Sequence, residues 1–359
     1  MSNKLFIVPI EQLDSRYTKQ WYDFLPAQLE KHGLEVVTIE GDEIPPEPTP
    51  GAFLDFAATN VYKSSQLVRI AQLIREGKVK NGDYFLYTDA WNPTVIQLKY
   101  MTELLGIKVK IGGLWHAGSY DQQDFLGRII GNAHWVRRAE VSMFNCYNHN
   151  FFATEFHLDM FALELFDKPG FILKENNSSV RVVGWPMEYL VDVLAPYTDT
   201  KKKQKIIFPH RIAPEKQLDI FKDLAESLPE YEWFVAQEHA LTKHEYHTYL
   251  AESKIAFSAN LQETLGISMY EAAVVGTVPM VPDRLSYREM WTDIGTYTSE
   301  WTTDWDSYQT HKELLIGHIK FLMGDTTDIV TKTKSSAVSV GLKFFNGEKL
   351  YQIITDQQS

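Results

Sequence analysis

The sequence predicts an α/β protein with two Rossmann-like domains, each built on a mostly parallel sheet with helices on both faces. Three observations support this fold class. The chain of 359 residues suits two hydrophobic cores better than one. Short apolar runs alternate with helix-like segments, and this alternation restarts after a polar stretch at residues 195–204. Because parallel strands end at one edge of a sheet, we expect a ligand in a central cleft that both domains face.

The first half of the chain supplies the first sheet and its helices. Apolar runs bounded by turn residues predict strands at 5–10, 34–41, 83–89, 108–115, 140–147 and 180–186. Amphipathic spacing predicts helices at 17–33, 61–77 and 94–106. The first two of these helices end at glycines, which readily adopt the left-handed conformation that stops a helix.

The second half repeats the alternation. Strands are expected at 205–210, 231–237, 254–260 and 278–283, and helices at 215–229, 242–253 and 265–276. Helical segments follow to the end of the sequence. We therefore expect a first domain over 1–195, a second over 196–335, and a tail over 336–359 that packs back on the first domain.

Composition limits the classes of function. No apolar run reaches the ~18–20 residues of a membrane span, and the N-terminal segment lacks the features of a signal peptide. The single cysteine, Cys146, excludes an internal disulfide and a multi-cysteine zinc site, and a cytoplasmic protein fits best. The formal net charge of −12 argues weakly against a nucleic-acid partner, because phosphate contacts need clustered Lys and Arg. A dinucleotide-binding G-x-G-x-x-G is absent, which counts against a dehydrogenase.

Two glutamates, Glu263 and Glu271, lie eight positions apart around the start of a predicted helix. The first amides of that helix, at Leu265, Gly266 and Ile267, form an anion site suited to a diphosphate. Glu263 lies beside this site and can hold the hydroxyls of a sugar, while Glu271 can accept hydrogen bonds from the vicinal diol of a ribose. The spacing therefore suits a sugar nucleotide, although acidic residues also occur at helix starts without any ligand.

At this point the sequence resembles a known family. Residues 263–281, ETLGISMYEAAVVGTVPMV, look like the E-x7-E region of retaining glycosyltransferases of the GT-B fold, of the group 1 or family 4 type. Residues 208–225, FPHRIAPEKQLDIFKDLA, look like that family's strand–Gly-Arg–x3-Glu-Lys–helix element, with His210 where the family usually has glycine. The resemblance implies that Arg211 and Lys216 bind the donor diphosphate, where two cations would neutralise the leaving group.

The first half fits this family by architecture and by single residues. The resemblance implies that His116, after a predicted strand, contacts the transferred sugar from the acceptor domain. The family's Gly-Gly loop is missing, and Arg16 or Tyr17 can take over an anion or acceptor contact. Asp89 and Trp91 follow another strand, where Trp91 can stack on a sugar or a base.

The resemblance implies an enzyme that moves a sugar from a nucleoside diphosphate donor, with a UDP-sugar favoured, to a hydroxyl with retention of configuration. Glu263 would orient the sugar and Glu271 the ribose. No metal and no cofactor besides the donor is expected, since amides, Arg211 and Lys216 would hold the diphosphate. The Asp-x-Asp sequence at 304–306 resembles a metal motif but is interpreted as a loop.

The acceptor is the more open question. Three segments are similar to glycosyltransferases of large tailed phages, some of which modify hydroxymethylated pyrimidines in DNA: 11–26, 88–101 and 112–128. This similarity implies an enzyme of the host cytoplasm that acts on duplex DNA, with aromatic side chains stacking on a flipped base: Tyr17, Trp21, Trp91 and Trp115. A small-molecule or glycan acceptor suits the acidic composition better. A nucleotide-sugar epimerase, a phosphorylase and a non-catalytic nucleotide-sugar binder remain alternatives.

Overall fold

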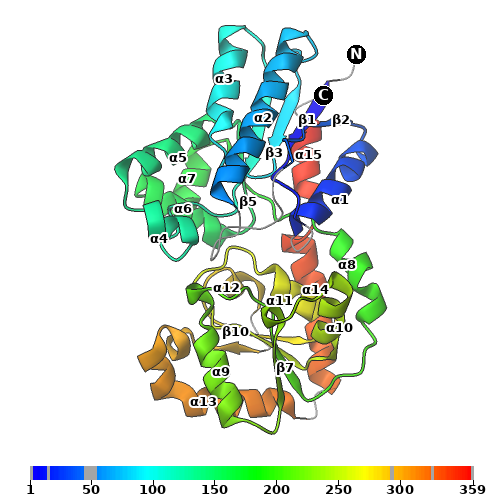
Figure 1. Cartoon of the computed structure of the whole chain (residues 1–359), viewed down its shortest axis with the longest axis vertical. Coiled ribbons are helices and arrows are strands. Elements are labelled where there is room, and N and C mark those ends of the chain that lie inside the picture. Colours follow the sequence, from blue (N-terminus) through cyan, green and yellow to red (C-terminus); the bar gives the residue numbers. More distant parts are fainter. Residues whose placement is uncertain (1–2, 14–16, 44–54, 292–294, 325–326, 357–359) are drawn as a thin grey trace. The chain divides into compact units, whose positions relative to one another are not determined.

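The computed structural model describes residues 3–13, 17–43, 55–291, 295–324 and 327–356. The chain divides into two compact units (Figure 1). The first unit comprises Met1–Pro186 and Gly347–Ser359, and the second comprises Met187–Asn346. The sequence predicts limits at 195 and 335 instead. The last helix, α15 (Glu348–Asp356), belongs to the first unit, where Glu348 lies 3.6 Å from His32 of the same unit.

The first unit is built on a parallel sheet whose strands run in the order β2-β1-β3-β4-β5-β6. Its strands are β1 (Lys4–Val8), β2 (Glu35–Thr38), β3 (Tyr84–Tyr87), β4 (Lys110–Leu114), β5 (His149–Phe152) and β6 (Val180–Val182). From β1 the chain passes to β2 on one side and later to β3 on the other. The switch point, where ligands bind in open α/β sheets, therefore lies between the carboxyl ends of β1 and β3.

Helices cover this sheet (Figure 1). They are α1 (Tyr17–Lys31), α2 (Phe56–Arg75), α3 (Thr94–Leu104), α4 (Phe125–Ile130), α5 (His134–Cys146), α6 (Glu155–Phe166) and α7 (Gly170–Asn176). Local caps fix several of their starts. The Asp55 side chain accepts hydrogen bonds from the amides of Ala57 and Ala58, both at 2.9 Å, and so satisfies donors that the first turn of α2 leaves unpaired.

The strand predicted at 140–147 is wrong, because this segment belongs to helix α5. Its buried residues Glu140, Met143 and Phe144 follow the spacing of one helix face, not the alternation of a strand. The strand is β5, a few residues later. Its polar residues hide it from a hydrophobicity pattern, although Asn150 is buried and donates to the carbonyl of Phe144 at 3.1 Å.

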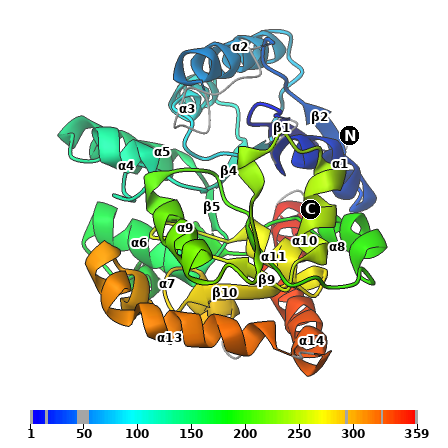
Figure 2. The same cartoon turned by 60° about the horizontal axis from the view of Figure 1, so that its bottom comes forward.

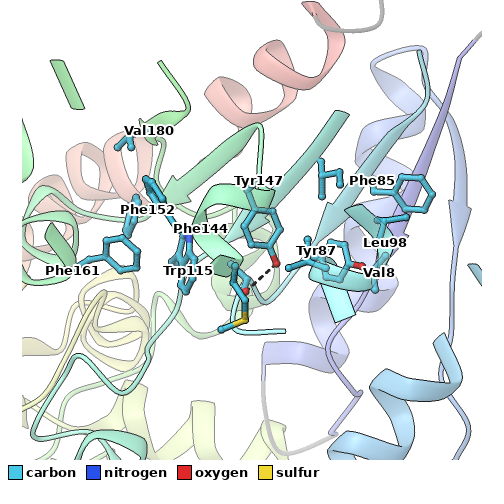
Figure 3. Packing of buried hydrophobic residues seen from close by; sticks show 14 of the residues in the cluster. Val8, Phe85, Tyr87, Leu98, Trp115, Phe144, Tyr147, Phe152, Phe161 and Val180 are labelled. Carbon is cyan, nitrogen blue, oxygen red and sulfur yellow. Dashed lines mark hydrogen bonds between the residues drawn. The ribbon is translucent and has the colours of Figure 1, made fainter. Parts of the chain in front are cut away.

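Aromatic side chains fill the core between this sheet and its helices (Figure 3). Trp115, directly after β4, lies among Tyr147, Phe152 and Phe161, with its ring centroid 4.9 Å from that of Phe161. Each fully buried aromatic side chain contributes on the order of 1.5–3 kcal/mol. This packing fixes the strand ends from which the candidate residues of the first unit extend.

The second unit is a further parallel sheet, with the strand order β11-β10-β9-β7-β8. Its strands are β7 (Lys205–Phe208), β8 (Glu232–Val235), β9 (Ile255–Phe257), β10 (Val278–Pro282) and β11 (Thr296–Tyr297). From β7 the chain passes to β8 on one side and then to β9 on the other. The switch point of this sheet therefore lies between the carboxyl ends of β7 and β9.

The helices of the second unit pack on this sheet, α9 beside α13 and α11 beside α14 (Figure 2). The longer ones are α8 (Tyr189–Leu194), α9 (Leu218–Ser227), α10 (Lys243–Glu252), α11 (Ile267–Val274), α13 (Trp305–Met323) and α14 (Thr327–Phe344). Shorter ones are η1 (Ala195–Tyr197), η2 (Pro214–Lys216), η3 (Ala236–Glu238), α12 (Tyr287–Met290) and η4 (Ser299–Thr302). Within the described ranges, no helix combines the length and the apolar character that a bilayer crossing demands.

The loop predicted at 304–306 is also wrong. Asp304 is the N-cap of α13, and its side chain accepts a hydrogen bond from the amide of Ser307 at 2.8 Å. Trp305 and Asp306 form the first turn of the helix. The acidic pair therefore stabilises a helix start, where the positive end of the helix dipole favours negative charge. The predicted fold class, α/β with two Rossmann-like domains, is confirmed.

Candidate active site

The motif residues of the second unit lie at the switch point of its sheet. Arg211 and Lys216 follow β7, and Glu263 and Gly266 follow β9, its neighbour. Because neighbouring parallel strands end at the same edge, segments about 50 positions apart in the sequence meet there. The contact is direct, since the ammonium of Lys216 lies 3.6 Å from a carboxylate oxygen of Glu263.

Glu263 occupies the predicted anion site with its own carboxylate. Its Oε1 accepts hydrogen bonds from the amides of Gly266 at 3.0 Å and Leu265 at 3.4 Å. Ile267, the third predicted residue, begins α11. These amides suit a negative charge, as the sequence predicts. A donor phosphate at this place would therefore share the amides with Glu263 or replace its carboxylate.

Gly266 is required at the start of α11 for two reasons. Its φ angle of +81° lies in the left-handed region, which side chains rarely adopt. A Cβ atom at this position would also lie 2.8 Å from the ring carbon Cε1 of Tyr287. The glycine thus allows the backbone to turn sharply against a buried aromatic ring and still present its amide to Glu263.

Lys216 is a buried cation held by the loop that carries Glu263. Its side chain is 7% exposed, and its ammonium donates to the carbonyl of Gln262 at 2.6 Å and to the side-chain oxygen of Gln262 at 3.3 Å. The next residue, Gln217, donates to the carbonyl of Thr302 at 2.7 Å. These bonds fix Lys216 beside Glu263, as its predicted role at the diphosphate requires.

Arg211 is paired with a different acid. Its guanidinium lies 2.5 Å from a carboxylate oxygen of Glu215, whose side chain is fully buried. Burial acts to raise the pKa of Glu215, but the charge of Arg211 and the hydrogen bonds to the carboxylate hold it below its usual value. The Arg211 side chain is 26% exposed, so it retains surface for a further anion.

Glu271 lies on α11 and turns its carboxylate toward α10. It is 5% exposed, and the hydroxyl of Tyr246 donates to its Oε2 at 3.1 Å. The Nε2 atom of His247 lies 3.9 Å from its Oε1. Each carboxylate oxygen can accept two hydrogen bonds, so Glu271 retains capacity for a ribose diol, the predicted role.

Sequence reasoning missed a buried polar network behind Glu263. The amide of the Asn260 side chain donates to the hydroxyl of Tyr287 at 3.0 Å and lies 3.5 Å from Oε2 of Glu263. The guanidinium of Arg284 donates to the backbone carbonyls of Ala259 and Asn260, both at 2.7 Å. Arg284 lies two residues after the apolar strand β10, and a cation so close to a buried strand end was the sequence signal for this network.

His210 stands where the resemblance implies glycine. It is 5% exposed, and burial, followed by the charge of Lys216, lowers its pKa well below the usual value. The ring is therefore neutral at physiological pH. Its Nδ1 lies 3.5 Å from the side-chain nitrogen of Asn260, so a neutral imidazole fills the space beside the network.

In the first unit the structure brings His116 and Tyr17 together. The Nε2 atom of His116 lies 2.6 Å from the carbonyl of Thr88, and its Nδ1 lies 3.0 Å from the Tyr17 hydroxyl. Because a carbonyl can only accept, Nε2 carries the proton and Nδ1 accepts from Tyr17. Burial lowers the pKa of His116, although Asp89 acts in the opposite direction. The imidazole is therefore neutral and fixed in orientation.

Asp89 and Trp91 also lie together, after β3. The Asp89 carboxylate accepts from the amide of Trp91 at 3.0 Å, and the ammonium of Lys63 lies 3.9 Å away. The indole N–H of Trp91 donates to Glu140 at 3.0 Å. Trp91 is half-buried and held at both its backbone and its ring, so stacking on an acceptor would use a pre-positioned face.

Two other residues, Trp115 and Arg16, were also predicted to contact the acceptor. Trp115 is fully buried, and its indole N–H donates to Asn150 at 2.9 Å. A base could not stack on it in this structure, so the prediction of an acceptor contact there is corrected to a role in the core. Arg16 lies outside the described residues.

Among the residues that the structure describes, no group of three or more His, Cys, Asp and Glu side chains is arranged to hold a metal ion. The predicted independence of metals and cofactors stays a prediction.

Solved structures match the chain over almost its whole length. The catalytic domain of starch synthase IV from Arabidopsis thaliana, bound to ADP and acarbose, has a TM-score of 0.60 at 12% identity and covers 99% of each chain. A sucrose-phosphate synthase from Thermosynechococcus elongatus has a TM-score of 0.59 at 9% identity, covering 99% of this chain and 98% of that chain. The fold is that of the GT-B glycosyltransferases.

A third match is Anabaena HepE in complex with UDP and glucose, with a TM-score of 0.57 at 12% identity, covering 98% of this chain and 99% of that chain. No family model and no curated protein matches the sequence. At these identities the likeness establishes the GT-B fold and leaves the activity to the residues of the site.

Proposed function

We propose that the protein is a GT-B glycosyltransferase that transfers a sugar from a nucleoside diphosphate donor, a UDP-sugar, to a hydroxyl acceptor. One observation carries this proposal. At the switch point of the second sheet, Lys216, Glu263 and the Gly266 amide form one contact group. A buried cation, amides at a helix start and a carboxylate are the groups that a diphosphate and its sugar need.

The donor would bind to the second unit. Lys216 and Arg211 would hold the diphosphate together with the amides of Gly266 and Ile267, without a metal ion. Glu263 would turn its carboxylate to the sugar hydroxyls once phosphate oxygens take over the Gly266 amide. Glu271, already oriented by Tyr246, would accept from the ribose diol.

The reaction would proceed with retention by attack on the face of the leaving group. The bond between the anomeric carbon and the diphosphate oxygen breaks, and the acceptor oxygen bonds to the same face of that carbon. The acceptor proton passes to the departing diphosphate, whose developing negative charge Lys216 and Arg211 stabilise. No protein nucleophile is required.

The first unit would supply the acceptor contacts, from His116, Tyr17, Asp89 and Trp91. The similarity to tailed-phage enzymes makes a hydroxymethylated pyrimidine in duplex DNA, in the cytoplasm of a host cell, one candidate acceptor. The alternative is a small-molecule or glycan hydroxyl. Lys63, a buried cation at this edge, is already held by Asp89 and by the carbonyl of Trp91 at 3.1 Å, which leaves it little capacity for DNA phosphate.

The test measures the release of nucleoside diphosphate from UDP-sugars and ADP-sugars. Each donor is incubated alone and with one candidate acceptor, which is hydroxymethylated duplex DNA, glucose or maltose. Unmodified DNA serves as the control. The proposal expects release with one donor that depends on an acceptor, and a product whose anomeric proton shows retained configuration by NMR. Inversion would contradict the mechanism. Absence of release with every donor and acceptor, despite tight UDP binding, would favour a non-catalytic binder.

Arg211→Ala is expected to weaken UDP binding by about 10- to 100-fold, because a charge-assisted contact to phosphate is lost. The variant should also unfold at a lower temperature, since it leaves the buried Glu215 carboxylate without this cation. The double variant Arg211→Ala/Glu215→Gln is the control, and it should recover stability without recovering affinity. Unchanged UDP affinity in both variants would remove Arg211 from the site.

A further inference from the structure

Glu11 presents an unexplained buried carboxyl group in the first unit. It follows β1 and is 1% exposed, and neither of its carboxylate oxygens has a hydrogen-bond partner among the residues that the structure describes. Burying a carboxylate without partners costs several kcal/mol in real proteins, about as much as a marginally stable domain can tolerate. Such a group is expected where binding of a ligand compensates for the cost.

The helix packed against Glu11 is polar on its inward face. Along the first half of α2, Thr59, Tyr62 and Gln66 are buried at helical spacing, where its second half buries isoleucines. Within the described part of the chain, the hydroxyl of Thr59 has no hydrogen-bond partner. Burial raises the pKa of Tyr62 to about 12, and the nearby Glu11 and Glu40 carboxylates act in the same direction.

One contact fixes this edge of the sheet. The side-chain amide of Gln66 donates to the carbonyl of Pro9 at 2.8 Å and to that of Ile39 at 2.9 Å. The segment carrying Glu11 is thereby tied to the end of β2. The unpaired carboxylate therefore has a defined place, on the segment between β1 and α1.

This place is the switch point of the first sheet. Glu11 follows β1, and Asp89 follows its neighbour β3, so both lie at the edge where open α/β sheets bind ligands. In the second unit the segment after β7 has the position of Glu11, and Glu263, after β9, corresponds to Asp89.

We propose that this switch point is a binding site for an uncharged, hydroxyl-rich acceptor, a sugar or small glycan. The Glu11 carboxylate accepts hydrogen bonds from sugar hydroxyls, and the Thr59 hydroxyl bonds a further sugar oxygen. The carboxylates of Glu11 and Glu40 disfavour the phosphates of DNA at this edge, where Asp89 is already paired with Lys63. The inference rests on the proposed function and names its acceptor class. Because Glu11 is buried, binding includes a local opening of this edge.

The test compares Glu11→Leu and Glu11→Gln with Glu30→Gln, an exposed glutamate of α1. Removing a buried carboxyl group that lacks hydrogen-bond partners should raise the midpoint of thermal unfolding by at least about 2–4 °C in Glu11→Leu. With UDP present, glucose or maltose should bind the wild type, as measured by saturation-transfer NMR. That binding should fall by about 10- to 100-fold in both Glu11 variants and stay unchanged in Glu30→Gln.

Several outcomes would overturn the proposal. A lower unfolding midpoint in Glu11→Leu would make Glu11 a structural residue. Sugar binding that is absent in the wild type or unaffected by the Glu11 variants would remove the site. Glu11-dependent binding of hydroxymethylated duplex DNA would replace the glycan acceptor with DNA. UDP binding is measured separately on the same samples, so its absence would identify a failure of the proposed function instead.

Discussion

Glu263→Gln is expected to slow sugar transfer by about a hundredfold or more while UDP affinity is unchanged or increased. The effect on rate has the size seen when one preorganised group that stabilises a transition state is removed. The effect on binding follows from the structure, because the carboxylate now occupies the amides of Gly266 and Leu265. A neutral side chain competes less well with phosphate for these amides. Steady-state kinetics and titration calorimetry with UDP measure the two effects.

Glu226→Gln provides the matched control, since Glu226 is exposed on α9 in the same unit. It should leave both the rate and the affinity unchanged. An equal loss of UDP affinity and transfer rate in Glu263→Gln would show that Glu263 serves the nucleotide and not the sugar. Full activity in the variant would remove Glu263 from the chemistry altogether.

Gly266→Ala is expected to lower the free energy of unfolding of the second unit by about 2–4 kcal/mol and to abolish detectable donor binding. The left-handed backbone costs about 1–2 kcal/mol for any residue with a Cβ atom. The new methyl group would also meet the ring of Tyr287 at 2.8 Å, and such overpacking costs typically about 1–3 kcal/mol. Denaturant unfolding and UDP titration measure the two losses.

Gly33→Ala separates the two causes. Gly33 has a similar φ of +82°, but a Cβ atom there would meet nothing within 4 Å. Its substitution should cost only the backbone strain and leave UDP affinity intact. If Gly266→Ala were no more damaging than Gly33→Ala, the close approach to Tyr287 would not shape the start of α11.

Much of the second unit could be predicted because its signals are local. Buried parallel strands such as β9 and β10 are apolar along their length, so a short apolar run between turn residues identifies them. The motif around Glu263 and Gly266 is likewise contiguous. The first sheet shows the limit of this approach: β5 carries buried polar residues such as Asn150, whose side-chain partners Trp115 and Ser179 are distant in sequence.

The parts of the candidate site that escaped prediction depend on tertiary contacts. Nothing local indicates that Tyr246 of α10 donates to Glu271, 25 positions later in the sequence. Trp115 shows the opposite error, in which a core residue is predicted to contact a ligand. An aromatic residue at a strand end looks the same in sequence whether it faces a ligand or the core. The sequence likewise does not indicate that Glu11 is buried, so its candidate role follows only from the structure.

Calorimetric titration of the wild-type protein with UDP, ADP and their glucose conjugates tests the central claim most directly, because every step depends on a nucleoside diphosphate at Lys216 and Gly266. We predict saturable binding of one nucleotide, strongest for UDP and lost in Gly266→Ala. At a ligand concentration of about 100 Kd, the bound nucleotide should add about 2.7 kcal/mol of stability. Absence of binding by every nucleotide, to a protein that is demonstrably folded, would contradict the account.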